Sequence, residues 1–140
     1  MVPMRPAITC ALLALASCSK PEAAVPPVEA GTFAGAGRDA LCIAGGADAR
    51  RAGFVVYGAG DANCSVNGRI EAAGTGWTLV PTGEESCRIA LALDDGKVAL
   101  GAQSEACNYY CGPGASFAGR TFARADAAAA VRDFAGDPLC

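Results

Sequence analysis

The 140-residue sequence contains no histidine, the residue that most often serves as a general base and that frequently binds metals. A Ser-His-Asp or Cys-His catalytic mechanism is therefore excluded. The sequence also has no Cys-x-x-Cys pair, and zinc sites usually combine such pairs with histidine. We therefore expect neither a metal site nor a metal cofactor.

Large apolar side chains are few, although 52% of the residues are nominally hydrophobic. Alanine and the N-terminal segment inflate that figure, and from Phe33 onward we count about 24 large apolar residues. A core of this size gives a single small domain little stability, so we expect covalent cross-links to contribute.

Long hydrophobic runs are also missing. The longest N-terminal run covers residues 7–16, whereas a membrane-spanning helix needs about 20 apolar residues. Arg5 precedes this run and gives the chain a weakly basic start. This pattern is typical of the apolar region of a secretory signal peptide.

The residues Leu15-Ala16-Ser17-Cys18 follow directly and resemble the lipobox of bacterial lipoproteins. The resemblance implies that residues 1–17 are a signal peptide and that Cys18 receives diacylglycerol and an N-acyl chain, for example palmitate. Ser19 after the cysteine is similar to outer-membrane sorting in a Gram-negative host. We expect a protein anchored by lipid in the cell envelope, at the outer membrane, with its periplasmic or surface orientation left open. An ordinary signal peptide with an incidental cysteine is the alternative.

Residues 18–31 are predicted to form the lipidated start and a tether. Residues 20–31 contain three prolines and two acidic residues without a periodic apolar face. Such a segment extends by about 3.1 Å per residue and would hold residues 32–140, the predicted folded domain, away from the bilayer.

Eight cysteines occur in the chain, and six remain after Cys10 in the signal segment and Cys18 at the lipidation site are set aside. An even number in an exported chain predicts three disulfides, with fifteen possible pairings among which the sequence does not choose. The six are Cys42, Cys64, Cys87, Cys107, Cys111 and Cys140.

The charge balance is mildly acidic. Without Arg5, the mature chain has 10 basic and 14 acidic residues and a net charge of −4. The absence of a basic patch in the sequence argues against nucleic acid as a partner. An acidic domain attracts a cationic partner.

Short β-type runs separated by glycine-rich turns follow from Phe33. Strands are predicted at residues 40–43, 53–57, 64–72, 77–80, 87–93 and 98–101. The last two flank Asp94-Asp95-Gly96-Lys97, and the Asp-Gly turn between them predicts a β-hairpin. Their number and spacing predict a mainly β fold, a small antiparallel meander barrel or sandwich stapled by disulfides.

Alternation and local breakers refine this prediction. Ile89, Leu91 and Leu93 share one strand face and should contact the core. Asn67-Gly68 indicates a bulge or a tight turn. Residues 126–135 are rich in alanine with apolar residues at helical spacing, which predicts one short C-terminal helix that stops near Gly136.

Two groups of residues resemble catalytic motifs without fulfilling them. Residues 114–119 lack the second glycine of a Gly-x-Ser-x-Gly nucleophile elbow, because Ala118 occupies that position. The acid pairs Glu84-Glu85 and Asp94-Asp95 fall in predicted turns, where they serve solubility and turn geometry. We therefore expect no catalytic residues and no enzymatic activity.

The most distinctive stretch is Cys107-Asn108-Tyr109-Tyr110-Cys111 followed by Gly-Pro-Gly. Tyr109 and Tyr110 in so constrained a loop predict a binding patch, because rigid aromatic side chains bind with little entropic loss. Arg120 and Arg124 lie just beyond and could flank a ligand groove. The alternative is a covalent knot in which the two rings complete a small core.

The whole layout of lipobox, tether, compact β domain and acidic balance is similar to that of the membrane-bound lysozyme inhibitors. The resemblance implies a non-enzymatic envelope protein that binds a protein or glycan and is attached to the membrane by its lipid. Two alternatives stay open, namely an accessory lipoprotein of an envelope assembly complex and an enzyme whose carboxylates converge in a cleft.

Overall fold

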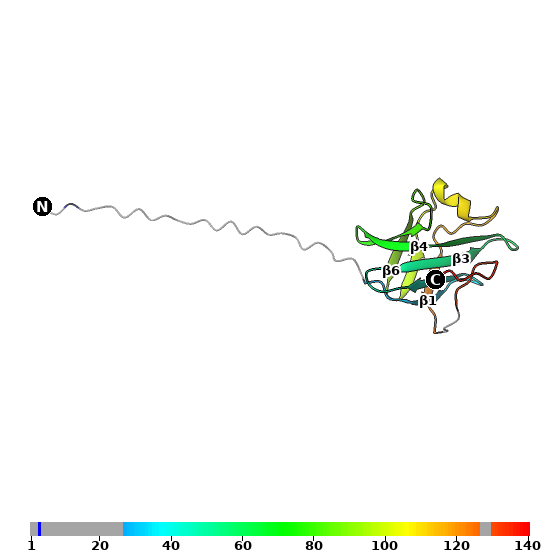
Figure 1. Ribbon diagram of the computed structural model, residues 1–140, viewed down its shortest axis with the longest axis horizontal. Helices are drawn as coiled ribbons and strands as arrows, with labels where there is room; N and C mark the ends of the chain where they lie inside the picture. The colour runs from blue at the N-terminus through cyan, green and yellow to red at the C-terminus, as the bar shows by residue number, and fades with distance from the viewer. Residues whose placement is uncertain (1–2, 4–26, 127–129) are drawn as a thin grey trace.

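Eight short antiparallel strands close into a barrel in the computed structural model, which describes residues 3, 27–126 and 130–140 (Figure 1). The strands are β1 (Gly31–Ala34), β2 (Ala40–Ala44), β3 (Arg51–Tyr57), β4 (Asn63–Ala73), β5 (Gly76–Pro81), β6 (Ile89–Asp94), β7 (Lys97–Leu100) and β8 (Thr121–Arg124). One 3-10 helix, η1 (Glu105–Tyr110), lies between β7 and β8. The lipobox and Cys18 lie outside the described residues.

Each strand pairs with its neighbours in sequence, so the sheet is a meander. The ring closes where β1 pairs with β8, with Phe33 opposite Arg124 and Ala34 opposite Ala123. The predicted antiparallel meander barrel is therefore confirmed. The sequence patterns did not reveal β1 and β8, the two strands that complete it.

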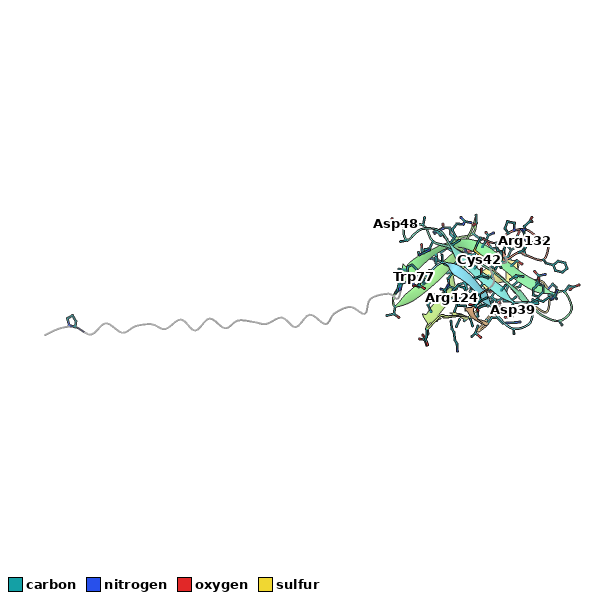
Figure 2. All side chains as sticks on the ribbon, turned by 90° about the horizontal axis from the view of Figure 1, so that it is seen from below. Asp39, Cys42, Asp48, Trp77, Arg124 and Arg132 are labelled. Carbon is teal, nitrogen blue, oxygen red and sulfur yellow. A yellow bond between two sulfur atoms is a disulfide. The ribbon has the colours of Figure 1, made fainter. Side chains whose placement is uncertain are left out.

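The antiparallel order gives the barrel two distinct ends. We call one the loop end; it carries the connections β1–β2, β3–β4, β5–β6 and β7–β8. We call the other the hairpin end; it carries the connections β2–β3, β4–β5 and β6–β7, the start of β1 and the end of β8. Figure 2 shows Asp48 and Trp77 toward the hairpin end and Asp39 toward the opposite end.

The barrel interior is filled by the alternate apolar residues of the strands. Phe54, Leu79 and Ile89 are fully buried at its centre, together with Phe122 from β8. The predicted inward face of β6 is confirmed, because Ile89 and Leu91 are buried and Leu93 is partly buried against the same cluster. Val28 is also buried in this cluster, so the folded domain begins a few residues before the predicted boundary at residue 32.

The β6–β7 hairpin forms as predicted. Asp94 pairs with Lys97, and the two residues between them, Asp95 and Gly96, have φ angles of 47° and 76°. Positive φ at both central residues is typical of a type I′ turn, whose twist matches that of the flanking strands.

Gly68 does not mark a bulge or turn, contrary to the prediction. It lies within β4, opposite Ala52 of β3 and Pro81 of β5 in continuous register. A Cβ atom at this position would lie 2.0 Å from the carbonyl oxygen of Val80. Glycine is therefore required by the close approach of the neighbouring strand.

The predicted C-terminal helix is wrong for residues 130–135, the part of it that the structure describes beyond Asp126. Residues 130–140 instead form a strap, in which Arg132 bridges to Pro138 and the backbone N–H of Leu139 donates to Val131. Val131 and Leu139 pack with Cys42 and Val55 in a second small cluster on the outside of β2 and β3. Packing against the sheet therefore outweighs the helical propensity of alanine.

Three disulfides form, as predicted, and the structure supplies their pairing: Cys42 with Cys140, Cys64 with Cys111, and Cys87 with Cys107. The first fastens the strap to β2. The other two fasten the β7–β8 connection to the barrel. No helix among the described residues has the length and apolar character needed to cross a membrane.

Candidate functional site

The connection between β7 and β8, residues 101–120, is the longest in the barrel and lies at its loop end; we call it the stapled loop. Cys107 in η1 is joined to Cys87 just before β6, and Cys111 is joined to Cys64 in β4. The backbone N–H of Gly112 also donates to the Asn63 carbonyl over 2.9 Å. Two covalent ties only four residues apart leave the segment between them little freedom.

Gln103 organises the interior of the stapled loop. Its Oε1 accepts hydrogen bonds from the backbone N–H of Phe117 (3.0 Å) and from the Ser116 hydroxyl (3.1 Å). Its Nε2 donates to Asn108 Oδ1 over 2.8 Å. One side chain therefore ties the two arms of the loop to η1.

Phe117 anchors the second arm in the barrel core. It is fully buried, and its ring contacts Phe54 edge to face at a centroid distance of 5.4 Å. The loop is thus held by an aromatic anchor as well as by two disulfides. Figure 1 shows η1, drawn in yellow, projecting from the body of the barrel.

Tyr109 is the most exposed large hydrophobic side chain of the described residues, with 88% of its surface open to solvent. Its ring meets that of Tyr110 edge to face at 5.3 Å, and Tyr110 packs against the barrel core. The two predicted roles are therefore divided, because Tyr110 completes the core and Tyr109 is displayed. A rigidly displayed tyrosine is a common centre of protein recognition.

Two acidic residues belong to this part of the barrel, Glu84 in the β5–β6 connection and Glu105 in η1. Burial raises the pKa of Tyr110, and the nearby charges of Glu84 and Tyr109 raise it further. Hydrogen bonds from the side chain and backbone of Ser86 lower the pKa of Glu84. Glu84 and Glu105 take part in no ion pair among residues 27–126 and 130–140, so their charges remain available to a partner.

Arg120 lies at the same end of the barrel but faces inward. Its Nη1 contacts Asp39 Oδ2 at 2.8 Å, while its Nη2 and Nε donate to the carbonyls of Tyr57 and Ser116. Asp39 is buried and also accepts the backbone N–H of Tyr57 at 2.9 Å. Arg120 therefore links the β1–β2 connection, the end of β3 and the stapled loop.

Arg124 lies at the hairpin end, so the structure does not bring the four predicted patch residues together. It contacts Glu29 at 3.5 Å and stacks over the Phe33 ring at 4.9 Å. It borders a groove of about 200 Å³ that is also lined by Asp94, Asp95 and Lys97. This volume is below the roughly 300–1,000 Å³ typical of small-molecule sites.

Glu84 and Glu85 lie in the β5–β6 connection and Asp94 and Asp95 at the β6–β7 turn, as expected for turn residues. Within the described ranges, no cluster of three or more cysteine, aspartate or glutamate residues has the arrangement needed to hold a metal ion.

Sequence reasoning missed Gln103 and Asp39, the two polar residues that organise the loop end. Neither belongs to a recognisable motif, because each acts on backbone groups brought near only by the fold. A single polar residue in the sequence does not by itself distinguish a structural role from a solvated one.

No protein family, curated protein or solved structure matches this chain.

Proposed function

We propose that this chain is a membrane-anchored, non-enzymatic lipoprotein of the cell envelope that binds a protein partner through the stapled loop. The observation that supports this most strongly is Tyr109, which is 88% exposed on a loop held by two disulfides. Exposing an aromatic ring to water is unfavourable, and fixing it beforehand reduces the entropy lost on binding. Both features favour recognition over a purely structural role.

The charges around the loop indicate the kind of partner. Glu84 and Glu105 are free of ion pairs within the described residues, and the mature chain would have a net charge of −4. A cationic protein complements this surface and is steered toward it. Lysozymes are cationic, which agrees with the similarity in layout to the membrane-bound lysozyme inhibitors.

The position of the loop suits a tethered binder. Residues 27–30, which lead into β1, lie at the hairpin end, where Glu29 contacts Arg124, whereas Tyr109 belongs to the loop end. If lipid on Cys18 anchors the chain, its tether reaches the end of the barrel opposite the stapled loop. The loop would then face away from the membrane.

Substitution of Tyr109 tests the proposed binding surface. The experiment uses the full chain solubilised in uncharged detergent. Tyr109→Ala should weaken both the capture of the partner protein and the inhibition of a cationic lysozyme by about 30-fold. This loss is expected when a central aromatic residue of an interface is removed. Phe134→Ala is the matched control, because Phe134 is an exposed aromatic residue on the strap, with 56% of its surface open. Circular dichroism should show the same fold for both variants.

Equal binding by wild type and Tyr109→Ala would contradict the proposal. Cross-linking in intact cells distinguishes the alternative function: capture of a resident envelope complex through the barrel wall, insensitive to Tyr109, would favour an accessory role in assembly. Mass spectrometry of the mature N-terminus tests the anchor separately, with acyl chains expected on Cys18.

A further inference from the structure

Three arginines line one pocket at the hairpin end of this acidic protein. The pocket has a volume of about 350 Å³ and is lined by Asp48, Ala49, Arg50, Arg51, Arg69 and Ile70; we call it the arginine pocket. Only ten basic residues follow Cys18, and three of them meet here. Figure 2 places Asp48 at the hairpin end of the barrel.

Two of the three guanidinium groups extend from directly opposed positions. Arg51 of β3 is the register partner of Arg69 of β4, so both side chains project from the same face of the sheet. Like charges at such positions repel one another and destabilise the sheet. An anion bound between them would remove this repulsion.

Carboxylates of the chain neutralise only part of this charge. Arg69 forms ion pairs with Glu71 at 3.6 Å and with Glu85 at 3.2 Å. Arg51 forms no ion pair with any residue that the structure describes, and Arg50 donates to the Gly45 carbonyl. Asp48 lines the pocket without approaching the arginines within ion-pair distance.

From this arrangement we infer that the arginine pocket binds a phosphate group. The planar guanidinium fork matches the oxygen geometry of phosphate and donates two parallel hydrogen bonds to it. The carboxylate of Asp48, which also lines the pocket, disfavours ligands that carry several further negative charges. The volume of about 350 Å³ is large enough for one phosphate and some of the atoms esterified to it.

The phosphate can come from a phospholipid headgroup or from a soluble phosphorylated molecule. The lipid source rests on the proposed function, because the hairpin end faces the bilayer only if Cys18 carries the anchor. The soluble source does not require anchoring. Free phosphate therefore tests the pocket even if the anchor or the Tyr109 surface fails its own test.

Thermal unfolding of the full chain in maltoside micelles, whose headgroups contain no phosphate, provides the test. Inorganic phosphate is titrated against chloride at matched ionic strength, and in a second arm phosphatidylglycerol is added to the micelles against uncharged diacylglycerol. Phosphate or phosphatidylglycerol should raise the melting temperature of the wild type. Arg51→Gln should raise the dissociation constant about tenfold.

Arg132→Gln is the matched control, because it removes the same charge from the strap, where Arg132 donates to the Gly136 carbonyl. It should respond to both probes as the wild type does. A shift with phosphatidylglycerol alone assigns the site to the headgroup, and a shift with inorganic phosphate assigns it to free phosphate as well. No shift with either probe, or an equal response of Arg51→Gln and wild type, would overturn the proposal.

Discussion

Asp39 is a buried acid whose two carboxylate oxygens both have partners within the fold. One accepts the backbone N–H of Tyr57, and the other pairs with Arg120, which also reaches the carbonyls of Tyr57 and Ser116. The pair joins the β1–β2 connection, the end of β3 and the start of β8. Asp39 is almost fully buried, whereas the Arg120 side chain is 32% exposed, so removal of the carboxylate would leave the Tyr57 N–H without its acceptor and Arg120 only partly hydrated.

Asp39→Ala should therefore lower the free energy of unfolding by about 2 kcal/mol, because it removes the acceptor of the Tyr57 N–H and the carboxylate of a half-buried ion pair. Asp61→Ala is the control, because its ion pair with Arg38 at 3.5 Å is largely exposed and such pairs contribute about 0–1 kcal/mol. Urea unfolding followed by circular dichroism measures both. Equal losses in the two variants would show that burial does not set the strength of the Asp39 pair.

Tyr110 makes stability depend on alkaline pH. Its pKa in the folded protein lies above the ordinary value of 10, mainly because of burial, so the folded state holds this proton more tightly than the unfolded chain. Stability is then fully present below pH 10 and falls as pH rises through the folded pKa. Tyr110→Phe should remove this part of the alkaline loss, as measured by urea unfolding from pH 9 to above the folded pKa. An unchanged alkaline slope in that variant would contradict the assignment.

The residues of the candidate site show how far single positions are predictable. Tyr109 and Tyr110 are singled out by the sequence because two rings between close cysteines are unusual, and the structure shows Tyr109 exposed and Tyr110 packed against the core. Arg120 and Arg124 are four residues apart in sequence but lie at opposite ends of β8. Proximity in sequence is a poor guide there, because a strand rises about 3.3 Å per residue.

Among the larger elements, the strap is the one that can be detached without opening the barrel. It contacts the outside of β2 and β3 through Val131 and Leu139 and is fixed by the disulfide between Cys42 and Cys140. Gly53 permits this contact, because a Cβ atom there would lie 2.5 Å from the Leu139 carbonyl oxygen.

Replacing Cys42 and Cys140 together by serine should cost about 2–4 kcal/mol and leave the barrel folded. The strap should then become sensitive to limited proteolysis, while the region from β1 to β8 stays protected. Phe134→Ser provides the control, because this exposed tip residue should change stability by less than about 0.5 kcal/mol. Cleavage spreading into the strands of the double variant would indicate that the strap is part of the cooperative core.

Prediction of elements succeeds where alternation and turn chemistry agree. The β6–β7 hairpin has both, with bulky residues on one face and an Asp-Gly turn. Strands β1 (GTFA) and β8 (TFAR) each contain a single large core residue, Phe33 and Phe122, so no period is visible in four positions. Local propensity predicts a helix in residues 126–135, but it does not include the packing of Val131 and Leu139 on the sheet, which decides the conformation of the strap.

At the scale of the whole molecule, the disulfides compensate for a small core. The three bridges join residues separated by 98, 47 and 20 positions, so together they constrain most of the unfolded domain. The sequence correctly predicts which six cysteines pair with one another. It could not predict the pairing, because two of the bridges depend on which segments meet at the loop end and the third depends on the packing of the strap on β2.

Complete reduction should therefore unfold the domain at physiological temperature. Each bridge typically contributes about 2–4 kcal/mol, and the total is comparable with the 5–15 kcal/mol by which ordinary domains are stable. Melting curves with and without excess dithiothreitol, with alkylation to count free thiols, measure the effect. A melting temperature unchanged after all six thiols are alkylated would contradict this prediction.

The pairing of β1 with β8 has a consequence for any binding partner. An open sheet offers unpaired backbone N–H and C=O groups along its outermost strands, and many peptide-binding domains capture an extended ligand by adding it there. Here the hydrogen bonds run around the full circle, so the eight strands offer no such border. A ligand therefore cannot bind by adding a strand to this sheet. It must instead contact exposed side chains and the connections at the loop end and the hairpin end.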